Sequence, residues 1–212
     1  MRYIYLHGFA SSPASRKARF LVEKLQEHSI HLETPDLAPD FQNLTITSQL
    51  AVIHGAIRGE PVVLIGSSLG GYLAALYAAE QPQIVERLVL LAPAFDFYEL
   101  WKKDLGPAKL AEWRENGTIC VYHYGAGQET PLGYQLLDDA SKYSAFPDFE
   151  QPCLILHGLR DEVVPFEKSA LFAAARPDNR KLLSFNSGHE LTDVLNEIWD
   201  SSCGFLLSAN TK

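Results

Sequence analysis

One serine of the sequence stands in a setting that predicts a nucleophile. Residues 63–72 read Val-Leu-Ile-Gly-Ser-Ser-Leu-Gly-Gly-Tyr, so an apolar run ends in a Gly-x-Ser-x-Gly pattern centred on Ser68. The residues before the pattern predict a buried strand, and the alanine-rich residues 69–80 predict a helix. So tight a turn holds the central serine in strained geometry, with its hydroxyl exposed at the carboxyl edge of a sheet. Because the pattern is weak alone, the prediction requires a base, an acid and an oxyanion site elsewhere.

The base and the acid are expected on later loops at the same edge of the sheet. A serine hydroxyl needs an imidazole to take its proton and an acid to orient that imidazole. Asp161 follows a predicted strand at 153–156, and His189 follows another at 181–185. This order, serine then aspartate then histidine, suits neighbouring parallel strands. We therefore predict that Asp161 is the acid and His189 the base.

Other side chains compete for these two roles. Asp96 follows the predicted strand 88–91, and some folds of this kind take their acid from that position. Glu162 adjoins Asp161 but is expected to point elsewhere. His7 follows the first strand, which suits a hydrogen-bonding post for its loop better than a base.

The tetrahedral intermediate of acyl transfer needs two oriented N–H donors, each worth on the order of 3 kcal/mol. The amide of Leu69, directly after Ser68 and at a predicted helix N-terminus, is the first candidate. The second is expected from the loop 7–12 after the first strand, where Gly8 allows the backbone to approach closely. We assign this second donor to the amide of Phe9.

Strands and helices alternate along most of the chain, as in a parallel sheet covered by helices on both faces. The first helix is expected to begin at Ser12 as N-cap with Pro13 in the first turn. The predicted strands are 3–6, 31–34, 62–65, 88–91, 153–156 and 181–185, and the predicted helices are 14–28, 45–58, 69–80, 166–174 and 191–207.

One long segment interrupts this alternation. About 60 residues separate the fourth and fifth strands, which exceeds a usual crossover. Residues 95–149 hold 11 of the 23 aromatic residues, including Trp101 and Trp113. The segment is either an excursion with a small core of its own or a cap-like insertion whose aromatic residues, Trp101 and Trp113 foremost, line a substrate pocket.

Composition narrows the classes of function. At 212 residues, with 47% hydrophobic and 21% charged residues, the chain fits one globular domain, 1–212. A net charge of −8 disfavours nucleic-acid binding. The three cysteines, Cys120, Cys153 and Cys203, suggest free thiols, and no spacing predicts a metal site or a cofactor. A strand is predicted from the first residues and no run spans a bilayer, so a soluble, cytoplasmic protein is expected.

Taken together, these features resemble the α/β-hydrolase superfamily, and more narrowly the small bacterial YqiA-like esterase family. The resemblance is carried by stretches that frame the chain outside residues 95–149: Tyr5-Leu6-His7-Gly8-Phe9, Ser11-Ser12-Pro13, Lys17-Ala18, Pro35-Asp36-Leu37, Gly66–Tyr72, His157-Gly158 with Asp161, and Gly188-His189. The order of strands and helices together with this resemblance predicts an α/β-hydrolase fold, with a mostly parallel sheet of about six strands and a cap-like insertion, 95–149, after the fourth. The resemblance also implies a metal-independent serine esterase acting on small acyl esters or thioesters.

Three alternatives remain open at this level. Residues 101–114 carry Lys102, Lys103, Lys109 and Arg114 against two acids, an excess that could meet the phosphates of an acyl-CoA thioester. A non-catalytic ligand receptor could keep the same fold, and a peptidase is also possible. The oligomeric state is left open by the sequence.

Overall fold

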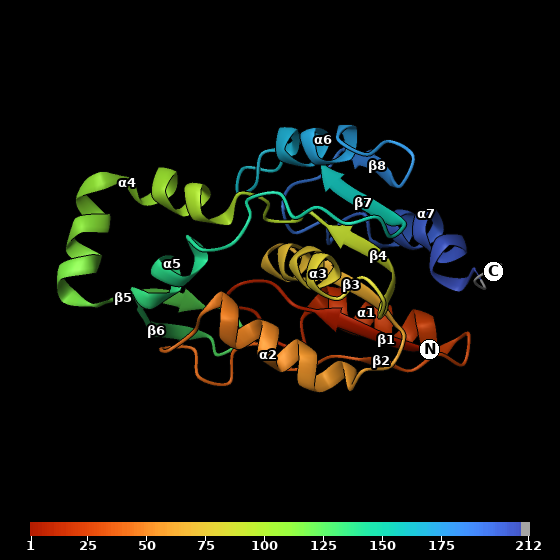
Figure 1. Ribbon diagram of the computed structural model, residues 1–212, viewed down its shortest axis with the longest axis horizontal. Coiled ribbons are helices and arrows are strands. Elements are labelled where there is room, and N and C mark those ends of the chain that lie inside the picture. The colour runs from red at the N-terminus through yellow and green to blue at the C-terminus, as the bar shows by residue number, and fades with distance from the viewer. Residues whose placement is uncertain (209–212) are drawn as a thin grey trace.

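A single parallel sheet forms the centre of the computed structural model, which describes residues 1–208 (Figure 1). All five strand pairs in this sheet are parallel. The strand order is β2-β1-β3-β4-β7-β8. The strands are β1 (Arg2–Leu6), β2 (Leu32–Glu33), β3 (Val62–Ser67), β4 (Val85–Leu91), β7 (Cys153–Gly158) and β8 (Arg180–Phe185). Each of the six predicted strands is thereby confirmed, with small changes of boundary.

Helices cover both faces of the sheet. Successive side chains of a strand point to opposite faces, so a continuous apolar strand has side chains to bury on each of them. Ile4 and Leu64 face a core formed with the helices α2, α3 and α6, whereas Tyr5 and Ile65 face a second core with α1 and α7. The helices are α1 (Arg16–Gln26), α2 (Ile46–Ile57), α3 (Leu69–Glu80), α6 (Phe166–Ala174) and α7 (Leu195–Leu207). The central strands are buried on both sides, as their continuous apolar sequences predict.

Two predicted helix starts were wrong. The first helix begins at Arg16, and its N-cap is Ser15, whose Oγ accepts a hydrogen bond from the Ala18 amide at 3.3 Å. Ser12 instead lies in the preceding turn, where its carbonyl accepts from the Ser15 amide. The last helix begins at Leu195 rather than at residue 191, because Leu191 has a φ of +55°, which a right-handed helix does not accommodate.

Most of the segment 95–149 lies beyond the carboxyl ends of the strands, and its last residues return along the sheet to the start of β7 (Figure 1). It contains α4 (Phe97–Asn116), an antiparallel hairpin of β5 (Thr118–His123) and β6 (Gln128–Gly133), and α5 (Gln135–Ala140). The helix α4 is bent at Gly106, whose φ of 71° and ψ of 167° break the helix just before Pro107. None of the helices within residues 1–208 combines the length and the apolar character needed to cross a membrane.

Candidate active site

Ser68 occupies the sharp turn from β3 into α3. Its backbone has φ 52° and ψ −119°, a strained conformation for a residue with a side chain. The turn fits closely against β1: a Cβ built on Gly70 would overlap the carbonyl oxygen of Leu6. The glycines of the pattern therefore allow the turn at Ser68 to pack closely against the edge of the sheet. Backbone strain at a serine in such a turn is typical of a functional residue.

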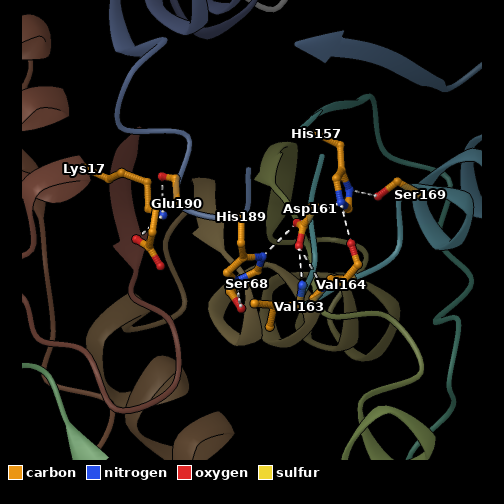
Figure 2. Close-up of polar contacts among 9 residues, drawn as sticks. All are labelled: Lys17, Ser68, His157, Asp161, Val163, Val164, Ser169, His189 and Glu190. Carbon is orange, nitrogen blue, oxygen red and sulfur yellow. Dashed lines mark hydrogen bonds and ion pairs between the residues drawn. The ribbon is translucent and has the colours of Figure 1, made fainter. Parts of the chain in front are cut away.

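The three residues expected to act together are hydrogen-bonded in a chain (Figure 2). His189 Nε2 lies 3.0 Å from Ser68 Oγ, and His189 Nδ1 lies 2.8 Å from Asp161 Oδ2. They follow β3, β7 and β8, whose carboxyl ends share one edge of the sheet. The imidazole is thus placed to accept from the serine while it donates to the carboxylate.

Asp161 is held from several directions. Its side chain is fully buried, and Oδ1 accepts hydrogen bonds from the amides of Val163 at 2.9 Å and Val164 at 2.8 Å. Burial raises the pKa of this carboxyl, but hydrogen bonds from His157 and His189 outweigh burial and hold its pKa well below the usual range. The carboxylate is therefore ionised at neutral pH.

The loop that carries His189 is fixed by a buried lysine that the composition did not reveal. Lys17 on α1 donates to the Glu190 carbonyl at 2.8 Å and lies 3.3 Å from the Glu190 carboxylate (Figure 2). Burial lowers the pKa of Lys17, and the negative charge of Glu190 opposes that effect. On the same loop, Ser187 donates to Asp193. The only sequence signal for Lys17 was its place in the family resemblance.

The loop after β1 passes directly beside Ser68. A Cβ built on Gly8 would lie 3.3 Å from Ser68 Cβ and 3.9 Å from its Oγ, so the backbone leading into Phe9 runs next to Ser68. His7 is 3% exposed; its Nε2 accepts from the Leu37 amide at 3.1 Å, and its Nδ1 contacts the Gly8 carbonyl at 2.9 Å. These contacts match the predicted role of His7 as a post for the loop.

The competing acids lie in other environments. Asp96 Oδ2 accepts from Lys168 Nζ at 2.5 Å, and Asp96 precedes α4 in a left-handed conformation. Glu162 is exposed. Of these three acids, it is Asp161 that His189 Nδ1 contacts. Within residues 1–208, no group of three or more His, Cys, Asp or Glu side chains is arranged to hold a metal ion.

The two tryptophans of the segment 95–149 have different surroundings. Trp113 is fully buried and donates from Nε1 to the Leu132 carbonyl at 3.0 Å. The prediction that Trp113 contacts substrate is therefore wrong, because no part of its ring is accessible. Trp101 is partly exposed and packs edge-on against Phe9, with ring centroids 5.1 Å apart. It also borders a pocket of about 540 Å³ between α4 and β5.

Three features define the α/β-hydrolase class: the parallel sheet, the strand–helix turn at Ser68, and the hydrogen bonds that link Ser68 to His189 and His189 to Asp161. A mouse structure named alpha/beta hydrolase domain-containing protein 10 superposes with a TM-score of 0.80 at 19% identity, covering 96% of this chain and 88% of that one. The chain belongs to the uncharacterised protein family UPF0227, whose sequence model matches residues 2–202. This match confirms the resemblance to YqiA-like proteins, and the structural likeness confirms the fold class.

Two curated relatives share part of their length with this chain. The Xenopus laevis protein named monoacylglycerol lipase abhd6-B is 27% identical over 212 residues, which cover 92% of this chain and 57% of the relative. The rat protein named palmitoyl-protein thioesterase ABHD10, mitochondrial, is 27% identical over 152 residues, 68% of this chain and 50% of the relative. The chain thus spans about half the length of these relatives.

Proposed function

We propose that this protein hydrolyses carboxylic esters through an acyl-enzyme, with Ser68 as nucleophile, His189 as general base and Asp161 as the orienting acid. The observation that carries the proposal is the hydrogen-bonded chain from Ser68 to His189 to Asp161 at a strained strand–helix turn. Relatives named as lipases and thioesterases support the same class of reaction.

In the first half of the reaction Ser68 Oγ attacks the carbonyl carbon of the ester while His189 Nε2 takes the hydroxyl proton. The amides of Phe9 and Leu69 donate to the oxyanion of the tetrahedral intermediate. His189 then protonates the leaving alkoxide as the ester bond breaks, which leaves an acyl group on Ser68. Water repeats the sequence in the second half, and the carboxylic acid leaves. Asp161 stabilises the imidazolium in both halves.

The chain acts as one domain, and residues 95–149 serve as its cap. The segment extends past the strand ends where Ser68, Asp161 and His189 lie, and Trp101 touches the ring of Phe9. Trp101 therefore contacts the side chain of the residue whose backbone amide is the proposed oxyanion donor. Side chains around it are suited to meet the acyl or alcohol part of a small substrate.

Thioester hydrolysis is the second candidate, favoured by the relative named as a palmitoyl-protein thioesterase. The same catalytic residues serve, because a thiolate is also a competent leaving group. An acyl-CoA is disfavoured at the pocket beside Trp101, because its charged lining holds Lys109 together with Asp104 and Glu112. Elsewhere in the basic stretch, Lys102 is paired with Glu99 at 2.7 Å. Two carboxylates against one lysine do not attract phosphates.

Labelling with a fluorophosphonate, which reacts quickly only with an activated serine, tests the proposal. We expect stoichiometric labelling of the wild-type chain, hydrolysis of p-nitrophenyl acetate, and neither in Ser68→Ala. Ser67→Ala is the matched control, because Ser67 adjoins the nucleophile within β3 and should retain most activity. An unlabelled, inactive wild-type chain would instead indicate a ligand receptor. A matched pair of simple ester and thioester, compared by kcat/KM, separates the two enzymatic candidates.

A further inference from the structure

A second buried histidine lies on the far side of Asp161 from His189 (Figure 2). His157, near the end of β7, is 0% exposed, and its Nε2 lies 3.0 Å from Asp161 Oδ2 and 3.0 Å from the Val164 carbonyl oxygen. Its Nδ1 lies 2.8 Å from the hydroxyl of Ser169, which is also 0% exposed. Oδ2 of Asp161 thus faces two imidazoles, one on each side.

The acceptors around His157 fix where its hydrogen lies. Both atoms facing Nε2, a carboxylate oxygen and a carbonyl oxygen, can only accept, so Nε2 carries the hydrogen. This single N–H is shared between the Val164 carbonyl and Asp161 Oδ2. Nδ1 of the neutral ring is then an acceptor, and the Ser169 hydroxyl donates to it. Every polar atom of the ring is satisfied in this tautomer, as a fully buried imidazole requires.

We propose that His157, held by Ser169, is a positioning residue that donates to Asp161 and so sets how strongly this carboxylate supports His189. The inference rests on the proposed function. His157 does not touch the reacting atoms. Both His157 and His189 contact Oδ2 of Asp161, and His157 holds the carboxylate on the side away from His189. The arrangement extends the polar chain by two residues, from Ser68 through His189, Asp161 and His157 to Ser169 on α6.

Two consequences follow when the donor at position 157 is lost. The carboxylate is no longer held from behind, and a less well placed acid lowers kcat by about tenfold to a hundredfold, in the range of supporting-shell substitutions elsewhere. The remaining carboxylate is also more basic and favours the protonated form of its partner. Activity requires the neutral imidazole, so the acid limb of the kcat/KM profile moves to higher pH.

We expect the other charged groups near Asp161 and His189 to stay in place in these variants, because Lys17 pairs with Glu190 rather than with His157. Lys17 approaches from α1, and its charge acts on Asp161 as well as on Glu190, which adjoins His189. A shift of the acid limb on substitution of His157 is therefore due to the lost donor and not to a rearranged charge on α1.

The experiment compares His157→Leu, which has no donor, with His157→Gln, whose side-chain amide places an N–H near the original Nε2. Rates of p-nitrophenyl acetate hydrolysis are divided by the concentration of sites titrated with a fluorophosphonate, so that unfolded protein does not enter kcat. We expect His157→Leu to lower kcat about tenfold to a hundredfold with KM unchanged and to shift the acid limb upward. His157→Gln should restore kcat to within a few-fold of the wild type.

A milder variant keeps the test decisive if His157→Leu does not fold. Ser169→Ala removes the hydroxyl that fixes the tautomer and should lower kcat about threefold to tenfold, again without a change in KM. Its matched control is Ser202→Ala, a buried serine on α7 whose hydroxyl bonds to the Ile198 carbonyl, remote from the site. Ser202→Ala should leave kcat and the acid limb unchanged.

The outcomes separate this inference from the proposed function. Loss of titratable sites with kcat per site, KM and pH profile unchanged would mean that His157 only stabilises the fold, and would overturn the inference. Equal losses in His157→Leu and His157→Gln would overturn it too, because the N–H would then be irrelevant. A wild-type chain that neither labels nor hydrolyses the ester would refute the proposed function itself, and this inference with it.

Discussion

Replacing Asp161 by asparagine tests the assignment of the acid most directly. The two oxygens of Asp161 have distinct partners: Oδ1 accepts from two backbone amides, and Oδ2 faces His189 Nδ1 at 2.8 Å and His157 Nε2 at 3.0 Å. Asparagine offers one oxygen and one NH₂ group in the same shape. Its oxygen must face the two amides, because a backbone N–H is always a donor, whereas an imidazole can move its hydrogen to the other ring nitrogen. The NH₂ group is then directed at His189.

A donor at that position reverses the tautomer of the base. Nδ1 of His189 would have to accept, so the hydrogen would move to Nε2, which lies 3.0 Å from Ser68 Oγ. An imidazole that already carries a hydrogen on Nε2 cannot take the serine proton. In serine protease triads this change lowers kcat by about four decades. Four decades correspond to about 5.4 kcal/mol of activation free energy, and we expect a loss of this size here.

The assay is steady-state hydrolysis of p-nitrophenyl acetate, with the thermal melt recorded to show that the variant is folded. Asp96→Asn is the matched control: it removes one charge from the pair with Lys168 at the same sheet edge and should cost less than about tenfold. If Asp161→Asn kept more than a tenth of wild-type kcat while Asp96→Asn lost several decades, the acid would belong to the loop after β4. The reasoning from Asp161 would then be refuted.

Three further expectations concern the surroundings of the site. Lys17→Met should lower kcat about tenfold by releasing the loop of His189, whereas Glu190→Gln, which keeps the carbonyl bonded by Lys17, should lose less than threefold; equal losses would contradict this view. The folded-state pKa of Asp161 is lowered, so its contribution to stability is present above the unfolded pKa of about 3.9 and is lost as pH falls below it. Urea unfolding at pH 5 and pH 3 should therefore show a smaller loss for Asp161→Asn than for the wild type. Trp113→Ala should cost about 3–5 kcal/mol of unfolding free energy, whereas Trp101→Ala should alter acyl-chain preference in kcat/KM with a smaller change in stability; the reverse pattern would place the substrate elsewhere.

The sheet was predictable because its signals are local and strong. Apolar runs such as 62–65 and 153–156 form strands buried on both faces, and the helices 69–80 and 166–174 begin and end where the sequence places them. The glycine-flanked Ser68 likewise marks its own turn. The predicted start of α1 was wrong although its signal is also local. Ser12-Pro13 has the sequence of a helix start, but these residues form a turn, and the N-cap of the helix is Ser15.

The segment 95–149 was harder because its helix carries little pattern. Only Phe97 and Trp113 of the 20 residues of α4 are buried, so no apolar stripe marks its face. The sequence of β5 is rich in β-branched and aromatic residues, and the turn-rich Gly125-Ala126-Gly127 follows it, so a hairpin could have been predicted here. Whether a tryptophan faces solvent or a core depends on tertiary packing, and spacing could not distinguish Trp101 from Trp113.

Supporting residues of the site are the least accessible to sequence reasoning, because their partners are distant in the chain. Lys17 meets Glu190 across 173 residues, and a lysine ordinarily indicates a solvated surface. His157 is only four residues from Asp161, but its role depends on Ser169, which α6 brings to the other ring nitrogen. A sequence motif names the groups that react, whereas their orientation depends on contacts that only the folded chain assembles.

The contacts of the segment 95–149 bear on how substrate choice and rate are coupled. Trp101 packs on Phe9, and the Gly125 amide of the hairpin turn donates to the Ala10 carbonyl at 3.3 Å, so two parts of the segment contact the loop after β1. The loops of Ser68 and His189 are instead fixed by the sheet and by α1. A substrate that displaces the segment would therefore move the Phe9 amide before it moves the nucleophile or the base. Changes in this segment are accordingly expected to alter kcat together with KM, because the proposed oxyanion donor lies against the surface proposed to select the substrate.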